Sequence, residues 1–243
     1  MPALVVSKAI AKTLVVGKTI HILTQPLPIV GLEIETISLI SHSGNPIQEA
    51  GASLCLGIMS SIALTPTRVL TGVTIPDTPL LTKALDLARE HSSDLIFNHI
   101  MRGLLLGFVI ADKLFPERDR EAHAVAAILH DMGLPLGHPP HSELLSDDKR
   151  FEVDGANTAC EFIKRQTAAA GVGAQWDRHR LQLVWDAIAL HTTPSIAFEK
   201  EDEIKACAFG IWADFQGPDQ VPHGLLTWDE YSPIVKVCHC WVF

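Results

Sequence analysis

The stretch HAVAAILHDMGL (residues 123–134) shows the pattern that decides the fold. An apolar run, AVAAIL, precedes a His-Asp pair, His130 and Asp131, and Gly133 follows shortly after. This composition predicts a buried helix that ends at the pair. A buried histidine or aspartate costs several kcal/mol unless it is paired or coordinated. Packing alone therefore does not account for the pair, and we expect partners for it elsewhere in the chain.

The composition is that of a folded, globular protein. The chain has 243 residues, of which 47% are hydrophobic and 19% are charged, and this length allows a sizeable core. The net charge of −9 argues against a nucleic-acid surface, which needs clustered Lys and Arg. The longest apolar stretches, 104–111 and 124–129, are too short to span a bilayer. We expect neither a nucleic-acid partner nor a membrane partner.

The cysteines indicate a reducing compartment. Their number, five, is odd and does not favour a disulfide framework in a chain of this length. Cys160 and Cys207 fall in helical patterns and are expected in the core. Cys238 and Cys240 flank His239, but no second ligand pair lies nearby, so this cluster is not expected to bind metal. With no presequence pattern evident, we expect a cytoplasmic location.

The pattern of apolar and polar residues changes near Pro76. Residues 1–75 hold short apolar runs broken by proline and glycine, which indicates short strands or loops and predicts an irregular N-terminal extension. Residues 76–236 show capped amphipathic helices, and residues 237–243 form a C-terminal tail. Proline and glycine exclude a long helix from 132–150. The prediction is an all-α domain with helices at 79–91, 94–114, 119–131, 153–169, 178–191, 201–215 and 227–236.

Metal-capable side chains lie near the ends of separate apolar helices. They are His99, the His130–Asp131 pair, His191 and Asp214. Two of these imidazoles and the two carboxylates would balance a divalent cation and leave coordination positions free for water and substrate. Gly210 and Cys207, four and seven residues before Asp214, are small enough to let that helix approach a shared centre.

Other histidines have a simpler structural interpretation. His123 shares a helix face with His130 and could support the site from behind, but a hydrogen-bonded core or surface residue is the favoured interpretation. His138 and His141 lie in a proline-rich loop and are expected to be exposed to solvent. We expect none of the three to bind the metal.

At these positions the sequence resembles a known family. FNHIMR (97–102), AAILHDMG (126–133) and the downstream Asp214 are similar to the HD-domain superfamily of metal-dependent hydrolases and related enzymes. Within it, the chain resembles the fungal cyanamide hydratase-like branch, and the likeness covers roughly residues 75–235. The blocks that carry it are NHIMR (98–102), RFEVDGAN (150–157), LVWDAIALHTTPSIA (183–197) and IWADFQGPD (211–219).

The resemblance implies an HD-domain helical bundle that holds one metal ion and acts on a small molecule. The implied ion is zinc, with Fe²⁺ or Mn²⁺ as alternatives. A metal-activated hydroxide would attack the carbon of a small electrophile, here a nitrile such as cyanamide, giving isourea and then urea. Asp131 would hold the attacking water, and His191, beside the pocket, would protonate the nitrogen. The implied ligands are His99, His130, Asp131 and Asp214.

Two alternatives to this hydro-lyase or hydrolase stay open. An HD-type phosphohydrolase acting on a nucleotide or another phosphate ester would need cationic groups near the metal, and Arg102 or the Lys149–Arg150 pair could supply them. Arg102 is instead expected to pair with Glu152 or Asp154. A non-catalytic HD-fold scaffold is the third interpretation, although all implied ligand positions are intact. The sequence leaves open whether the protein forms a homo-oligomer.

Overall fold

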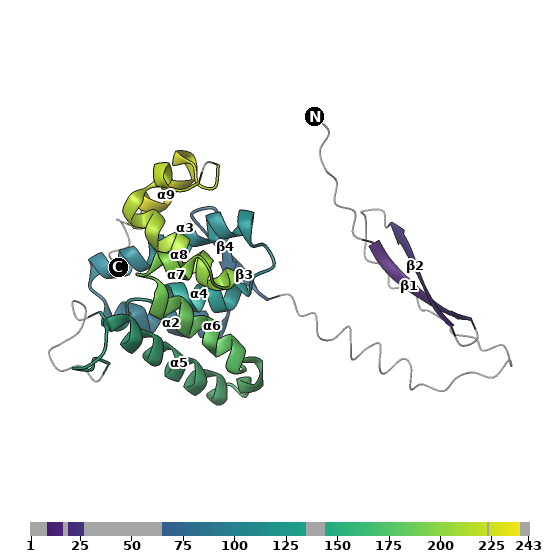
Figure 1. Cartoon of the computed structure of the whole chain (residues 1–243), viewed down its shortest axis with the longest axis horizontal. Coiled ribbons are helices and arrows are strands. Elements are labelled where there is room, and N and C mark those ends of the chain that lie inside the picture. Colours follow the sequence, from purple (N-terminus) through teal and green to yellow (C-terminus); the bar gives the residue numbers. More distant parts are fainter. Residues whose placement is uncertain (1–8, 17–18, 27–64, 135–143, 223, 239–243) are drawn as a thin grey trace. The chain divides into compact units, whose positions relative to one another are not determined.

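The computed structural model describes residues 9–16, 19–26, 65–134, 144–222 and 224–238. The chain divides into two compact units, Met1–Ile62 and Ala63–Phe243. In the first unit, β1 (Ala9–Val16) and β2 (Thr19–Pro26) pair as an antiparallel hairpin (purple in Figure 1). We expected irregular structure for the other residues of this unit, and these lie outside the described residues. The end of the tail, from residue 239, lies outside them as well.

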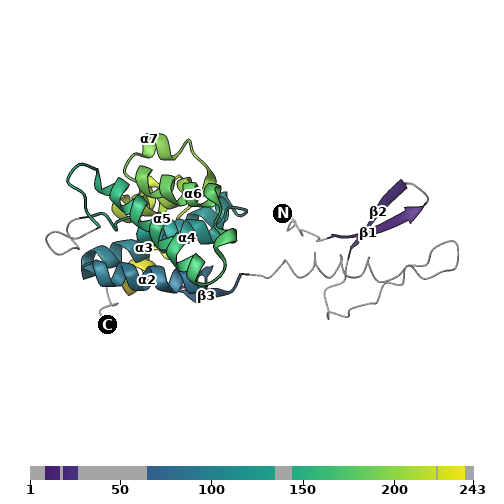
Figure 2. The ribbon, with the colours of Figure 1, turned by 90° about the horizontal axis from the view of Figure 1, so that it is seen from below.

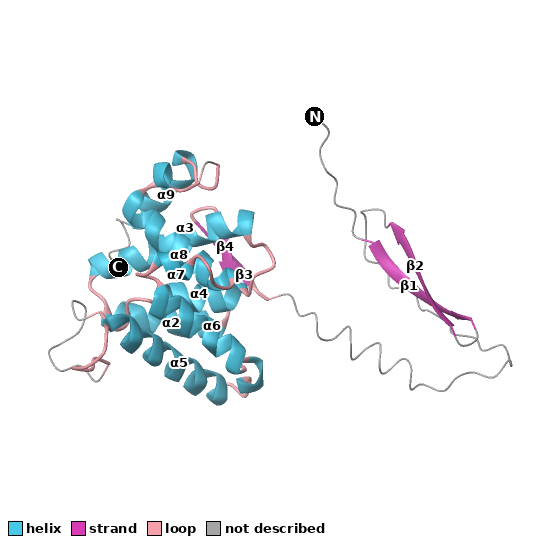
Figure 3. Ribbon diagram, in the orientation of Figure 1, coloured by secondary structure: helices cyan, strands magenta, loops and turns pink. Residues whose placement is uncertain are grey.

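The second unit is predominantly helical, as predicted (Figure 3). Each predicted helix is present, with ends that shift by at most two residues, and Pro194 also begins a short helix that the sequence did not predict. The elements are α2 (Pro79–His91), α3 (Asp94–Leu114), α4 (Arg120–Leu129), α5 (Phe151–Ala169), α6 (Arg178–Leu190), α7 (Pro194–Ala197), α8 (Asp202–Gln216) and α9 (Trp228–Cys238), with 3-10 turns η2 (Gly173–Gln175) and η3 (Pro218–Gln220).

A short hairpin, β3 (Thr67–Leu70) and β4 (Val73–Pro76), precedes these helices. Thr71 (φ 49°) and Gly72 (φ 83°) form its two-residue turn, where positive φ at both positions is what a type I′ turn requires. Val73 and Ile75 are buried in the helical core. The hairpin therefore packs as part of the helical unit, which begins before residue 76, the start that we assigned to the domain from the sequence.

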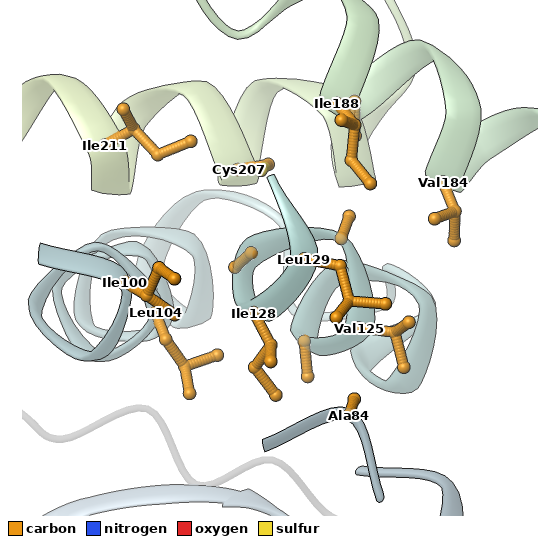
Figure 4. Packing of buried hydrophobic residues seen from close by; sticks show 14 of the residues in the cluster. Ala84, Ile100, Leu104, Val125, Ile128, Leu129, Val184, Ile188, Cys207 and Ile211 are labelled. Carbon is orange, nitrogen blue, oxygen red and sulfur yellow. The ribbon is translucent and has the colours of Figure 1, made fainter. Parts of the chain in front are cut away.

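Helix α4 lies at the centre of the helical unit. Its residues from Ala122 to Leu129 are all buried, which explains why the sequence from Ala124 to Leu129 is apolar throughout. In Figure 4, Val125, Ile128 and Leu129 are surrounded by side chains of α2, α3, α6 and α8. The second view shows α4 among α2, α3, α5 and α6, with α5 packed against α6 (Figure 2). The residues that follow α4 therefore begin in the interior of the unit.

Glycines set two close approaches, one between α8 and α3 and one between the end of α4 and α5. A Cβ on Gly210 would lie 2.1 Å from Gly103 O and 2.6 Å from Gly107 Cα, so glycine is needed where α8 crosses α3. This confirms the expectation that small residues let α8 approach closely. Gly133 has no positive φ, but a Cβ there would lie 2.0 Å from Phe151 O. Gly133 thus brings the start of α5 against the end of α4.

The longest helix and the helical cysteines both belong to the core. Among the described residues, α3 is the one helix long and apolar enough to cross a membrane by length and composition, yet 67% of its apolar window is buried inside the protein. Cys160 and Cys207 are buried free thiols, as expected. Burial raises their pKa values to about 11 and about 12. Both cysteines therefore serve as small core residues.

Candidate metal centre

His130 forms the end of α4. The helix ends at Leu129, and His130 keeps helical dihedrals (φ −62°, ψ −30°) as the C-cap. Its Nδ1 lies 2.9 Å from Ala127 O. Because a carbonyl oxygen only accepts hydrogen bonds, Nδ1 carries the ring proton. The lone pair of the neutral ring is therefore on Nε2, and the whole side chain is buried.

His99 reaches the same point from α3. Its Nδ1 lies 2.6 Å from Asp214 Oδ2 on α8, so this ring also carries its proton on Nδ1. The Nε2 of His99 lies 3.2 Å from the Nε2 of His130. Two lone pairs at this distance repel each other unless a proton or a metal cation lies between them. The tautomers are those that histidine ligands adopt, with the second nitrogen hydrogen-bonded to a carboxylate or carbonyl.

Asp131 completes a group of three potential ligands. Its Oδ2 lies 3.3 Å from His130 Nε2 and 3.9 Å from His99 Nε2. One ligand atom from each residue lies within 4.8 Å of the others, and all three residues are buried. Three protein ligands with one position open are typical of catalytic zinc sites. The donors therefore fit one divalent cation.

The electrostatics of the group favour a positive charge between its members. Burial alone would lower the pKa of His130, but the charge of Asp131 and its hydrogen bond outweigh burial and raise that pKa. Burial would raise the pKa of Asp131, but the surrounding histidines, His130 foremost, hold it well below its usual range. Asp131 is thus an anion at neutral pH. The balancing charge is a proton on His130 or a metal ion that displaces it.

Asp214, the fourth implied ligand, lies behind His99 and outside the group of three. Arg102 donates from Nε to Asp214 Oδ1 (2.5 Å) and from a terminal nitrogen to Oδ2 (2.9 Å). Burial would raise the pKa of Asp214, but the hydrogen bonds from His99 and Arg102 outweigh burial and lower it. In this geometry Asp214 orients the ring of His99, as carboxylates do behind histidines that bind metal.

The expected pairing of Arg102 with Glu152 or Asp154 is wrong. Arg102 forms its forked ion pair with Asp214, whereas Glu152 and Asp154 accept hydrogen bonds from other donors. Helical spacing places Arg102 one turn after His99, on the face that carries the ligand. It does not say which carboxylate of another helix meets that face. In the structure, α8 approaches this face, and its carboxylate Asp214 is the one that pairs with Arg102.

His191 ends α6 as His130 ends α4. It is the C-cap (φ −60°, ψ −27°), and its Nδ1 lies 2.7 Å from Ile188 O, so Nδ1 again carries the proton. Its Nε2 lies 3.8 Å from Asp131 Oδ1 and is not part of the three-ligand group. Burial, followed by the charge of His130, lowers the pKa of His191 to about 4. The ring is therefore neutral at pH 7 and can accept a proton on Nε2.

Residues for which the sequence predicted other roles, or none, fix the backbone around His191. Thr192 Oγ1 donates to Glu152 Oε1, and Arg150 donates to both oxygens of Glu152. Burial would raise the pKa of Glu152, but the hydrogen bonds from Arg150 and Thr192 outweigh burial and lower it to about 2. Trp212 on α8 donates from Nε1 to His191 O (3.2 Å). The sequence Thr-Thr-Pro after His191 was the one local sign of this arrangement, but it does not indicate which residues contact it.

A cavity of about 730 Å³ is lined by two of the three potential ligands, His99 and Asp131. Sequence reasoning missed its apolar wall, although Leu95 precedes His99, and Ile211 precedes Asp214, by about one helical turn. Such spacing places each pair on one helix face. The polar lining is His99, Arg102, Asp131, His191, Thr192 and Asp214, and the apolar lining is Leu95, Ile96, Leu134, Phe151, Ile211, Trp212 and Phe215.

The histidines with a structural interpretation lie apart from this group or outside the described residues. Arg118 Nε donates to His123 Nδ1 (3.0 Å), and the His123 ring stacks on Phe108 with 4.6 Å between ring centroids. This confirms that His123 is a hydrogen-bonded core residue. The expectations that lie outside the described residues concern the side chains of His138, His141, Cys238, His239 and Cys240.

Comparison with known proteins gives one positive result. No curated protein and no solved structure matches the chain significantly. The family model described as HD domain matches residues 96–211, a span that contains His99, His130, Asp131 and His191 and ends just before Asp214. Together with the buried cluster of His99, His130 and Asp131, this match supports a place for the chain in the superfamily of HD-domain metal-dependent hydrolases.

Proposed function

We propose that this protein is a metal-dependent hydratase or hydrolase that adds water to a small neutral electrophile of nitrile type, such as cyanamide. The observation that supports this most is the charge of the cavity. Among the described lining residues, Arg102 is the one permanent cation, and Asp214 neutralises it. A neutral substrate needs no cationic partner there, whereas a phosphate ester does.

The residues of the site divide between holding an ion and moving protons. A divalent cation bound by His99, His130 and Asp131 would act as a Lewis acid and bring the pKa of water from about 15.7 towards 7. Asp131 Oδ1, which faces His191 Nε2, can accept a hydrogen bond from the attacking water. Two imidazole nitrogens and a carboxylate suit zinc, and also Fe²⁺ and Mn²⁺. We favour a single zinc ion.

His191 acts as a base first and as an acid second. Because its ring is neutral at pH 7, Nε2 can take a proton from the water as the C–O bond forms and one π bond of the nitrile breaks. His191 then donates this proton to the nitrile nitrogen. With cyanamide the product is isourea, and transfer of the second water proton from oxygen to nitrogen gives urea. The Nδ1 hydrogen bond to Ile188 O keeps the ring in the tautomer that this relay requires.

The phosphohydrolase alternative would have to use arginines that already have partners. Arg102 donates two hydrogen bonds to Asp214, one to each carboxylate oxygen. Arg150 lies 3.3 Å from Thr192 Oγ1 on the cavity lining, but it is ion-paired to Glu152. Binding of phosphate by Arg150 would therefore have to break a partly buried ion pair. The cost of breaking this pair makes phosphate binding less favourable. For this reason we prefer the neutral substrate.

The test combines metal analysis of the purified full-length protein with two activity assays. We expect about one metal ion per chain and urea formation from cyanamide, and we expect the chelated protein to lose this activity. Phosphate release from nucleotides without urea formation would replace the proposal with a phosphohydrolase. Protein that binds none of Zn²⁺, Fe²⁺ and Mn²⁺ would indicate the non-catalytic scaffold instead.

A further inference from the structure

The cavity is much larger than the smallest substrate requires. Its volume is about 730 Å³, within the range of about 300–1,000 Å³ that is typical of pockets for drug-sized ligands. A water molecule takes about 30 Å³ in the liquid, and cyanamide is hardly larger than a few waters. A substrate of that size would leave most of the cavity filled with solvent. The residues that line the rest of the cavity indicate what else could bind there.

The outer lining of the cavity is unusually apolar for solvent-facing surface. Leu95 and Phe215 are 74% and 73% exposed, the highest values among the large hydrophobic side chains that the structure describes, and both line this cavity. Single exposed apolar residues are common, but two at the mouth of one cavity indicate a binding surface. We call Leu95 and Phe215 the apolar collar.

The apolar collar is continuous with the candidate metal centre. Leu95 lies one helical turn before His99 on α3, so the two side chains share a helix face. Phe215 directly follows Asp214 on α8, and its ring centroid lies 4.7 Å from that of His99. A molecule whose reacting carbon is near His99 and Asp131 therefore meets apolar surface as it extends outwards. Ile211, which is buried, continues this surface inside the cavity.

We propose that the apolar collar binds an alkyl or aryl group of the substrate, so that the protein prefers substituted cyanamides or organic nitriles to cyanamide itself. This inference rests on the proposed function and adds the substrate class to it. The nitrile end lies among the polar groups of the centre, and the substituent covers Leu95 and Phe215. Removal of this apolar surface from water gives the binding free energy that selects the substituent.

The first test compares two substrates with the same reacting group. N-phenylcyanamide and cyanamide are hydrated to N-phenylurea and urea by the same addition of water. We expect kcat/KM to be at least about 10-fold higher for N-phenylcyanamide, the size of effect that a well-placed apolar group gives. An equal or lower value would overturn the inference while leaving the proposed function intact.

The second test measures binding without turnover. N-phenylurea should raise the melting temperature of the full-length protein, and urea at the same low millimolar concentration should not. If no nitrile is hydrated by metal-loaded protein, the proposed function fails, and this measurement still decides whether the collar binds an apolar group. Absence of N-phenylurea binding would overturn the inference that the collar binds an apolar group.

Matched variants connect both measurements to the collar. Leu95→Gln and Phe215→Gln replace exposed side chains, so the metal content should not change. We expect each variant to lose most of the preference for N-phenylcyanamide and most of the binding of N-phenylurea. Val69→Gln, at a 65% exposed apolar position of β3 away from the cavity, is the control and should change neither. A preference that survives in both collar variants, or a change in oligomeric state with no change in preference, would assign the collar to another partner and overturn the inference.

Discussion

Helices α4 and α6 end in the same way but deliver histidines of opposite character. His130 and His191 are both C-caps, and each holds Nδ1 on the carbonyl oxygen three residues back. Each ring therefore offers Nε2 to Asp131, at 3.3 Å and 3.8 Å. Yet the charge of Asp131 outweighs burial and raises the pKa of His130, whereas burial lowers the pKa of His191 to about 4.

The difference comes from the neighbours and not from the helix ends. His130 is followed by Asp131 and faces a second imidazole, His99, at 3.2 Å. His191 is followed by Thr192, and the positive charge of His130 disfavours a second proton on its ring. A capped helix end therefore fixes a tautomer. The groups around the free nitrogen decide whether it binds a cation or transfers a proton.

The largest effect is expected from His130→Ala. This change removes one of the three proposed ligands, so bound metal should fall to near zero and turnover should be undetectable. Metal per chain and the rate of substrate hydration are the measurements. His179→Ala, at an exposed histidine of the other helix, is the matched control and should retain both. Stoichiometric metal in His130→Ala would show that the ligand set is wrong.

A smaller effect is expected from His191→Ala, because His191 transfers protons and holds no metal in the proposed site. Metal content should be retained, and kcat should fall by about 10²–10⁴-fold, the usual contribution of a general acid–base group. Metal content, melting temperature and kcat are measured on the same variant. Loss of metal together with activity would make His191 a ligand. A lower melting temperature with retained turnover would make it a packing residue.

The third prediction concerns the residue behind His99. In Asp214→Ala the Nδ1 of His99 loses its acceptor, and metal affinity should fall by about 10–100-fold while full occupancy is still reached at high metal concentration. Arg102→Gln should act in the same direction with a smaller effect, since Asp214 keeps its contact with His99. Metal titration of both variants gives the result. If Asp214→Ala bound no metal at any concentration, Asp214 would be a direct ligand.

The fold could be predicted well from the sequence because local signals mark the helix ends. Thr78 and Ser93 accept hydrogen bonds from the backbone N–H groups of Leu81 and Ile96 at the starts of α2 and α3, as helix caps do. The hairpin β3–β4 was less predictable. Its two strands are short, and apolar alternation over so few residues does not distinguish a strand from a loop.

The site could be predicted in its residue types but not in its pairings. Helix ends and faces identified His99, His130, Asp131 and His191, because a polar group on a buried apolar helix needs a partner. The partner itself depends on how distant helices cross. The ion pair of Arg102 with Asp214 rests on the approach of α8 to α3, which the glycines permit. Sequence periodicity contains no information on that crossing.

The smallest predicted effect concerns Glu152, which supports the turn after His191. Glu152 accepts hydrogen bonds from Thr192 and Arg150. In Glu152→Gln an amide N–H₂ group replaces one accepting oxygen and faces a donor, so the metal-free protein should lose about 1–3 kcal/mol of unfolding free energy at pH 7. Denaturant unfolding of the chelated protein measures this. Glu161→Gln, at an exposed position of the same helix, is the control and should have little effect.

The pH dependence of this loss gives its sign and its cause. The hydrogen bonds from Arg150 and Thr192 overcome burial and lower the pKa of folded Glu152 to about 2, whereas an unfolded glutamate has a pKa of about 4.3. The stability that comes from its ionised form is therefore complete above about pH 4.3 and is lost as the pH falls towards about 2. The wild type and Glu152→Gln should differ by a constant amount from pH 7 to about pH 5 and converge below that. A difference that stayed constant down to pH 3 would show that packing, and not the charge, makes Glu152 stabilise the turn after His191.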